Sequence, residues 1–204
     1  MSKATLSKHM KEDLTGVGDD LSNAGPFITI SRQFGCHGFS VGLLLLDLLN
    51  EGADPDESWH IYHREILTRL ATETDMAEDI LERQRRARPR LFTGLFRSRG
   101  KGRTPSGMQI RNEITTIIRG LAIDGRAIII GQGGSGATMD LPNGISIRLE
   151  APEDWRVKQV AFRDGLSETQ ARMRIRAKER ERAYLRKLYE AKYRRTPAFN
   201  LLYD

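Results

Sequence analysis

The sequence lacks a pair of cysteines, a long apolar run and the apolar centre of a secretory signal. Cys36 is the only cysteine among 204 residues, so an internal disulfide is excluded and a reducing cytoplasm is the expected location. No apolar run approaches the roughly 18 residues of a membrane-spanning helix. Residues 1–25 are polar and lack the apolar centre of a secretory signal, so we predict a disordered N-terminal tail there.

Acidic residues are fewer than basic ones. The 33 Lys and Arg residues against 27 Asp and Glu give a formal net charge of +6 at pH 7. This excess favours anionic partners such as nucleotides, phosphates or nucleic acid, although charge alone does not choose among them. The sequence contains no spaced His, Cys and Asp cluster typical of a zinc site. Residues 26–204 are numerous enough to form one α/β domain with a real core.

The most informative segment is 27–42, where a β-branched run enters a glycine-punctuated turn and an apolar helical stretch leaves it. Glycines let a backbone approach phosphate closely, and the open N–H groups of a helix start carry partial positive charge. The Walker A motif GxxxxGK[ST] is altered, because Arg32, Gly38 and Phe39 occupy its first glycine, lysine and hydroxyl positions. We still predict phosphate binding by this turn. The candidate residues are Gly35, Cys36, His37, Gly38, Phe39 and Ser40.

Short apolar runs alternate with helical patterns, which predicts an α/β fold with a doubly wound, parallel, five-stranded sheet. Leucines occupy most faces of the helix expected at 39–50, so we predict that this helix is buried. The β-branched run at 126–131 is typical of an interior strand covered on both faces. Residues 132–136 form either a flexible loop or part of a ligand site, and we favour the ligand site because it follows this strand.

Two basic regions lie between the expected strands. Residues 73–105 are predicted to be an insertion, and the arginines at 83–103 are interrupted there by glycine and proline. Residues 165–195 are predicted to be a mobile basic lid, whose helix is capped by Ser167 with Gln170 three residues later. Glutamates along this helix can pair with its arginines, so we expect only one to three arginines to reach a ligand.

Five segments, in this order, resemble the cytidylate kinase-like family, a branch of the P-loop nucleoside monophosphate kinases. They are ITISRQFG at 28–35, YHREI at 62–66, AIIIGQ at 127–132, APEDWRV at 151–157, and GLSE at 165–168 with the basic helix after it. The resemblance covers about residues 27–203. It implies a P-loop kinase-like fold in which the 73–105 insertion lies on the acceptor side.

The resemblance implies transfer of the ATP γ-phosphoryl group to a nucleoside monophosphate, with CMP or dCMP as first candidates and Mg²⁺ as cofactor. Such chemistry needs positioning and positive charge more than reactive side chains. The predicted catalytic residues are the arginines Arg32, Arg176, Arg180 and Arg182. The candidate substrate-binding residues are His63, Arg111 and Gln132, and the candidate magnesium ligand is Ser40.

Three departures from the family pattern bear on activity. His37 replaces a glycine, His63 replaces an aspartate and Gln132 replaces an arginine. These changes leave open a second function, a catalytically degenerate nucleotide-binding sensor or partner-binding module. A third alternative is a nucleic-acid binder that uses the basic arm at 83–103. The sequence predicts no membrane partner, and it does not choose the base or the oligomeric state.

Overall fold

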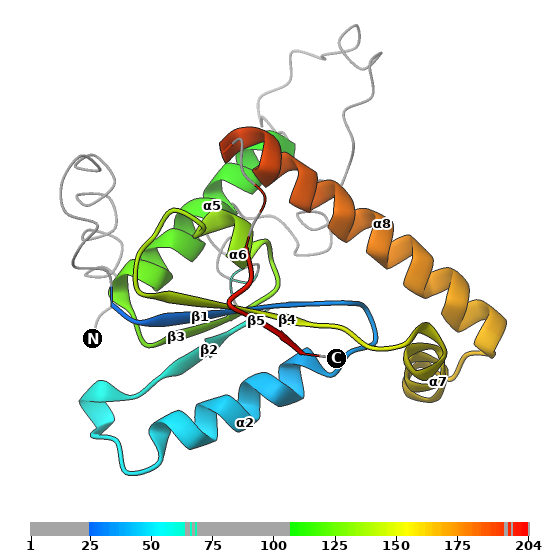
Figure 1. Ribbon diagram of the computed structural model, residues 1–204, viewed down its shortest axis with the longest axis horizontal. Helices are drawn as coiled ribbons and strands as arrows, with labels where there is room; N and C mark the ends of the chain where they lie inside the picture. The colour runs from blue at the N-terminus through cyan, green and yellow to red at the C-terminus, as the bar shows by residue number, and fades with distance from the viewer. Residues whose placement is uncertain are drawn as a thin grey trace, which may run out of the picture.

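A computed structural model describes residues 25–63, 66, 68, 107–193, 196 and 198–203 (Figure 1). The predicted N-terminal tail up to residue 24 and the predicted 73–105 insertion lie outside these residues. Among the described residues, no helix combines the length and the apolar character needed to cross a membrane.

Five parallel strands form one sheet in the order β2-β3-β1-β4-β5. The central strand is β1, whose Ile28 is paired with Ile128 of β3 on one side and with Ile145 of β4 on the other. Each connection between parallel strands must cross over the sheet, so helices cover its faces. The predicted doubly wound α/β fold is confirmed. The strands are β1 (Phe27–Arg32), β2 (His60–Tyr62), β3 (Ala127–Ile130), β4 (Gly144–Leu149) and β5 (Leu201–Tyr203).

Helices lie on both faces of the sheet. Figure 1 shows α2 on one face and α5, α6 and α8 on the other. Alternate strand residues feed two cores: Ile28 and Ile130 pack toward α2, whereas Phe27 and Ile129 pack toward α5. The helices are α2 (Gly38–Asn50), the 3-10 turn η2 (Pro55–Glu57), α5 (Gly107–Asp124), α6 (Gly134–Ala137), α7 (Glu153–Asp164) and α8 (Glu168–Tyr193).

Helix α2 is less buried than its leucine run predicts. It packs on the sheet through Val41, Leu45 and Leu49. Leu44 and Leu48 are instead 64% and 67% exposed. A helix that lies on a sheet contacts it with one face, so leucines on the opposite face stay exposed. The prediction of a buried helix is therefore wrong for that face.

Helix α8 begins with the capping box that the sequence predicts. Gln170 N donates to Ser167 Oγ at 3.3 Å, and Ser167 N donates to Gln170 Oε1 at 2.9 Å. Farther along, the Tyr189 ring packs against α6, where a Cβ at Gly136 would lie only 2.6 Å from Tyr189 Cγ. The Tyr189 hydroxyl also lies 3.0 Å from Thr115 Oγ1 of α5. These contacts hold α8 across the face of the sheet that carries α5 and α6.

Candidate functional site

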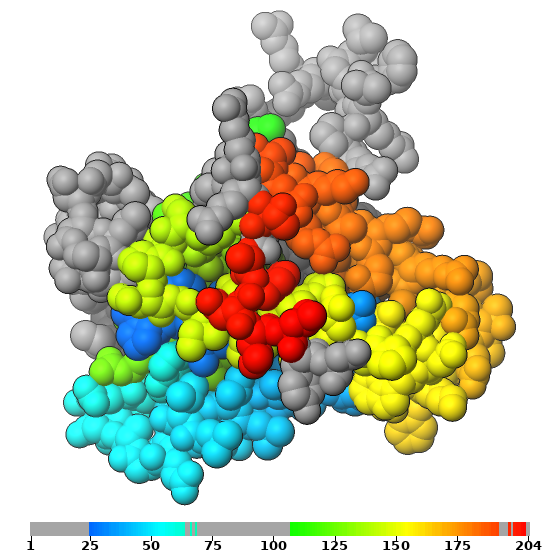
Figure 2. All heavy atoms as spheres, in the orientation of Figure 1, coloured from blue at the N-terminus to red at the C-terminus, as the bar shows by residue number. Residues whose placement is uncertain are grey.

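A cavity of about 480 Å³ lies at the carboxyl ends of β1 and β3, against α8. This edge is where parallel α/β sheets bind ligands, and the volume suits a small molecule. The described lining contains five arginines and no carboxylate, so the cavity is suited to an anion. The arginines are Arg32, Arg148, Arg163, Arg182 and Arg186. Near the cavity, the C-terminal segment (red) passes between α2 and α8 (Figure 2), and Phe199 from this segment contributes to the lining.

The turn after β1 supplies backbone donors to the cavity. Gly35 has a φ of +98°, and a Cβ there would lie 3.0 Å from Arg156 Cβ, so this position requires glycine. Gly38 N donates to Cys36 O at 2.7 Å, which closes the turn. The amides of Phe39 and Ser40 begin α2 and have no acceptor among the described residues. They carry the partial positive charge of a helix start and remain open to an anion.

The side chains of Cys36 and His37 are engaged with the protein. His37 Nε2 lies 3.1 Å from Gln159 Oε1, and the His37 ring packs edge-on against Trp155 with centroids 5.6 Å apart. Cys36 packs beside the core under α2, and burial raises the pKa of its thiol. The thiol therefore stays protonated at neutral pH despite its place near a helix start. The groups of this turn that remain open to an anion are therefore backbone amides.

Arg32 lies across the ends of three strands. A Cβ at Gly38 would lie 2.5 Å from Arg32 Cδ, and a Cβ at Gly131 would lie 2.0 Å from Arg32 Nη1. The two glycines thus leave the space that this side chain fills. Beyond them, Arg32 Nη2 lies 2.9 Å from His63 Nε2, just after β2. The structure therefore brings the predicted residues Arg32 and His63 together in the cavity.

Gln132 lies beside this pair. Its Nε2 donates to His63 O at 3.1 Å. Gly131, Gln132 and Gly133 have φ values of +67°, +53° and +87°, so the chain bends sharply as β3 leads into α6. Positive φ is uncommon for a glutamine, and residues held in such conformations cluster at functional sites. Of the two alternatives for 132–136, the flexible loop does not describe this segment, which is a tight bend followed by a buried helical turn, and Gln132, Gly133, Ser135 and Gly136 line the cavity.

Helix α8 is fastened to the turn by side chains from its middle. Glu179 Oε1 accepts a hydrogen bond from Phe34 N, and Arg182 Nη1 donates to Arg32 O at 2.7 Å. The guanidinium groups of Arg163 and Arg182 each lie 5.3 Å from the centroid of the Phe34 ring, within the cation–π range. Arg182 therefore both holds the turn and faces the cavity.

Other predicted site residues lie elsewhere. The side chain of Arg176 is 66% exposed and lies 3.9 Å from Glu153, and Arg180 is also exposed. Arg111 is half-buried on α5. None of these three arginines is among the described residues that line the cavity. Of the predicted lid arginines, the structure brings only Arg182 to the turn.

Sequence reasoning missed several polar residues of the lining. Arg148 had the clearest signal, because it interrupts the apolar strand β4 and is only 9% exposed. Charged residues are rarely buried without a partner, so one inside a strand marks a special environment. Arg186 follows Arg182 by one helical turn, which places both on one face of α8. Ser31 and Ser135 carried no distinguishing pattern.

The described residues contain no group of three or more His, Cys, Asp or Glu side chains that could hold a metal ion. Ser40, the predicted magnesium ligand, is exposed at the start of α2 and lines the cavity. Hard cations such as Mg²⁺ prefer oxygen ligands, and this hydroxyl is one such group.

The comparisons with known proteins agree with this architecture. A crystal structure of an uncharacterized protein from Eubacterium ventriosum ATCC 27560 is similar with a TM-score of 0.56 and 18% identity, over 87% of this chain and 86% of that one. At this identity the likeness shows the fold alone. No curated protein matches the sequence. A model of the cytidylate kinase-like family matches residues 27–204, which include the whole sheet and cavity, and the chain therefore belongs to that family.

Proposed function

We propose that this protein catalyses ATP-dependent phosphoryl transfer to a nucleoside monophosphate, with CMP and dCMP as the first acceptors to test. The observation that carries the proposal is the cavity, where five arginines, no described carboxylate and two open amides meet at the strand ends. Phosphoryl transfer depends on positioned phosphates and on positive charge that stabilises the transition state. Membership of the cytidylate kinase-like family supports the same class of reaction.

In the proposed reaction, the amides of Phe39 and Ser40 bind the donor phosphates. Arg32 and Arg182 neutralise the charge that develops on the transferred phosphoryl group. Arg32 is already held by His63 at 2.9 Å, so little side-chain freedom is lost when a ligand binds. Arg182 comes from α8, whose position over the cavity helps to exclude water.

The acceptor side of the proposed site is the end of β2 and β3. His63 and Gln132 lie there and are joined by the hydrogen bond from Gln132 Nε2 to His63 O. The Gln132 amide can hydrogen-bond a base or a phosphate oxygen but supplies no charge. Mg²⁺ would neutralise charge on the donor phosphates, with the Ser40 hydroxyl as the protein group that fits it.

The test is a coupled assay of ADP release with ATP, Mg²⁺ and CMP, dCMP, UMP or AMP. We expect turnover with at least one acceptor. Arg32→Ala should lower kcat/KM by roughly 100-fold or more, because a charge aimed at the transition state is lost. Lys158→Ala is the matched control, since Lys158 is exposed on α7 and outside the described lining. A folded protein that turns over none of the acceptors contradicts the proposal.

A second candidate function is a catalytically degenerate nucleotide sensor. It is favoured by the contact between α8 and the turn, where Glu179 accepts from Phe34 N, and by the neutral Gln132 at the end of β3. Micromolar binding of ATP measured by calorimetry, without turnover of any acceptor, would favour this function over a kinase. The nucleic-acid alternative rests on residues 83–103, which lie outside the described residues.

A further inference from the structure

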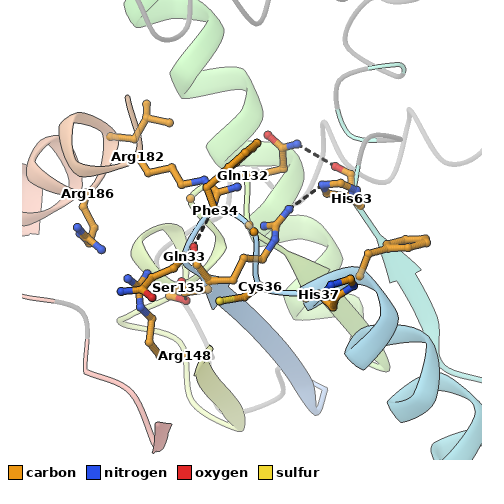
Figure 3. A pocket seen from close by; sticks show the side chains of 18 of the residues that line it. Gln33, Phe34, Cys36, His37, His63, Gln132, Ser135, Arg148, Arg182 and Arg186 are labelled. Carbon is orange, nitrogen blue, oxygen red and sulfur yellow. Dashed lines mark hydrogen bonds between the residues drawn. The ribbon is translucent and has the colours of Figure 1, made fainter. Parts of the chain in front are cut away.

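Three of the five arginines that line the cavity lie toward one end of it. Figure 3 shows Arg148, Arg182 and Arg186 toward α8, and His37 and His63 at the opposite end. Figure 3 also shows Ser135 beside Arg148 at this end, and the Ser135 hydroxyl lies 2.9 Å from that of Ser31. We call Ser31, Ser135, Arg148 and Arg186 the α8-side subsite. None of these residues belongs to the turn at 35–40.

Arg148 is a buried cation whose donors are only partly used. Its Nε donates to Glu150 Oε1 at 3.0 Å, and its guanidinium carbon lies 6.0 Å from the centroid of the Phe199 ring. These contacts fix the side chain, but both Nη groups lack an acceptor among the described residues. Arg148 is paired in register with Ser31 of β1, so the two side chains share one face of the sheet. A buried guanidinium with unused donors is stabilised by an anion that accepts from them.

Arg186 brings a second guanidinium to this end from α8. It lies between Arg182 and Tyr189 on one face of the helix, and Tyr189 anchors that face to α6. Arg163, Arg172 and Arg182 each have a carboxylate within 4.0 Å. Arg186 has no ion pair or hydrogen bond with any described residue, although it is half-buried. Its charge is therefore available to a ligand in the cavity.

A chain of four hydroxyls leads from the half-buried Ser146 of β4 to this subsite. Ser146 Oγ lies 2.9 Å from Thr29 Oγ1, Thr29 Oγ1 lies 3.0 Å from Ser135 Oγ, and Ser135 Oγ lies 2.9 Å from Ser31 Oγ. Three hydrogen bonds use three of the four hydroxyl protons. An anion beside Ser31 orients the chain so that each hydroxyl donates toward the cavity, and the fourth proton is donated to the anion.

We propose that the α8-side subsite binds a phosphoryl group, separately from the phosphates that the 35–40 turn is proposed to bind. Two guanidinium groups and a serine hydroxyl converge there, and planar guanidinium groups match phosphate oxygens well. The inference rests on the proposed function for the class of ligand, and it adds a second location for a phosphoryl group. That group belongs either to a second molecule or to the far end of one ligand that spans the cavity.

The test uses the full chain with inorganic phosphate as the probe. Crystals soaked in phosphate are expected to show density against Arg148 and Arg186. In solution, calorimetry should find that Arg186→Gln weakens phosphate binding by roughly tenfold or more, because a charge-assisted hydrogen bond is lost. Ser31→Ala should weaken binding less. The matched control is Lys187→Gln, which removes the same charge from the next residue, exposed on α8 and outside the described lining.

The outcomes separate this inference from the proposed function. Phosphate bound at 35–40 only, with Arg186→Gln unchanged, overturns the subsite and leaves the proposed donor site intact. Phosphate bound at Arg148 and Arg186 only supports the subsite and counts against donor binding by the turn. Equal weakening of phosphate binding by Arg186→Gln and Lys187→Gln also overturns the subsite. Such a result would mean that only the long-range charge of the helix matters and that Arg186 makes no direct contact with phosphate. A nucleoside bisphosphate that binds far more tightly than two separate phosphates identifies a single spanning ligand.

Discussion

At the scale of single residues, glycines shape the cavity because they have no side chain. Gly38 and Gly131 leave the space through which Arg32 reaches His63, and Gly35 lets the turn pass close to Arg156. Any side chain at Gly131 would collide with the Arg32 guanidinium before it met other protein. The position of the charge at the strand ends therefore depends on neighbours that have no Cβ.

Gly131→Ala tests this dependence, with Gly52→Ala as a matched control. Both glycines have left-handed backbone, with φ values of +67° and +72°, so both variants should lose about 1 kcal/mol of stability. A Cβ at Gly131 lies 2.0 Å from Arg32 Nη1, whereas a Cβ at Gly52 meets nothing within 4 Å. Only Gly131→Ala should also displace Arg32 and weaken triphosphate binding, measured by calorimetry. Equal affinity in the two variants would show that the placement of Arg32 does not matter for binding.

At the scale of secondary-structure elements, α8 links the turn to the rest of the fold. Its middle holds the turn through Glu179 and Arg182, and its C-terminal half rests on α6 through Tyr189. Arg182 and Arg32 are 150 residues apart in sequence, so this helix closes a long-range contact. The conformation of the turn is therefore coupled to the docking of α8 on the rest of the fold.

Glu179→Ala is expected to loosen this coupling. The Phe34 amide loses a charged acceptor, which should cost about 1–3 kcal/mol in the free energy of unfolding. The free energy of opening that hydrogen exchange reports at the Phe34 amide should fall by a similar amount, so exchange there becomes faster. Glu190→Ala on the same helix is the control, because Glu190 has no partner among the described residues, and it should change stability by less than about 0.5 kcal/mol. Unchanged exchange at Phe34 in Glu179→Ala would contradict the role of this contact.

The elements that the sequence predicted correctly are those governed by local rules. The β-branched run of β3 and the capping pair Ser167 and Gln170 are read from neighbouring residues alone. The exposure of Leu44 and Leu48 was not predictable in this way, because it depends on how much of α2 the sheet can cover. Arg148 joins the cavity only because its strand pairs with β1 in a particular register. Sequence periodicity contains no information on that register.

At the scale of the whole molecule, the sheet order places β1 at the centre. Residues from both faces of the sheet therefore meet at the carboxyl end of this strand. The turn and α2 come from one face, while Ser135 and the α8 arginines come from the other. The strands, the turn and Arg182 were predicted from the sequence, but Arg148 and Arg186 were not, because their meeting in the cavity requires both layers to be packed. The spacing of these layers is therefore part of the site.

Gly42 sets the spacing between α2 and the sheet. A Cβ there would lie 2.5 Å from Ile130 Cδ1 and 2.9 Å from Ile61 Cδ1, on two different strands. Alanine favours a helix over glycine by about 1 kcal/mol, whereas overpacking costs about 1–3 kcal/mol, so Gly42→Ala should be destabilising overall. The measurement is the free energy of unfolding in urea.

Ile130→Val removes the Cδ1 atom with which the new methyl group would collide. Alone it should cost about 0.5–1.5 kcal/mol, because a buried methyl group is lost. In the double variant the methyl at position 42 occupies that space, so the combined loss should fall short of the sum by about 1 kcal/mol. Strict additivity would mean that α2 can move away from the sheet freely. In that case the spacing of the layers, and with it the position of the turn, would not be fixed by this glycine.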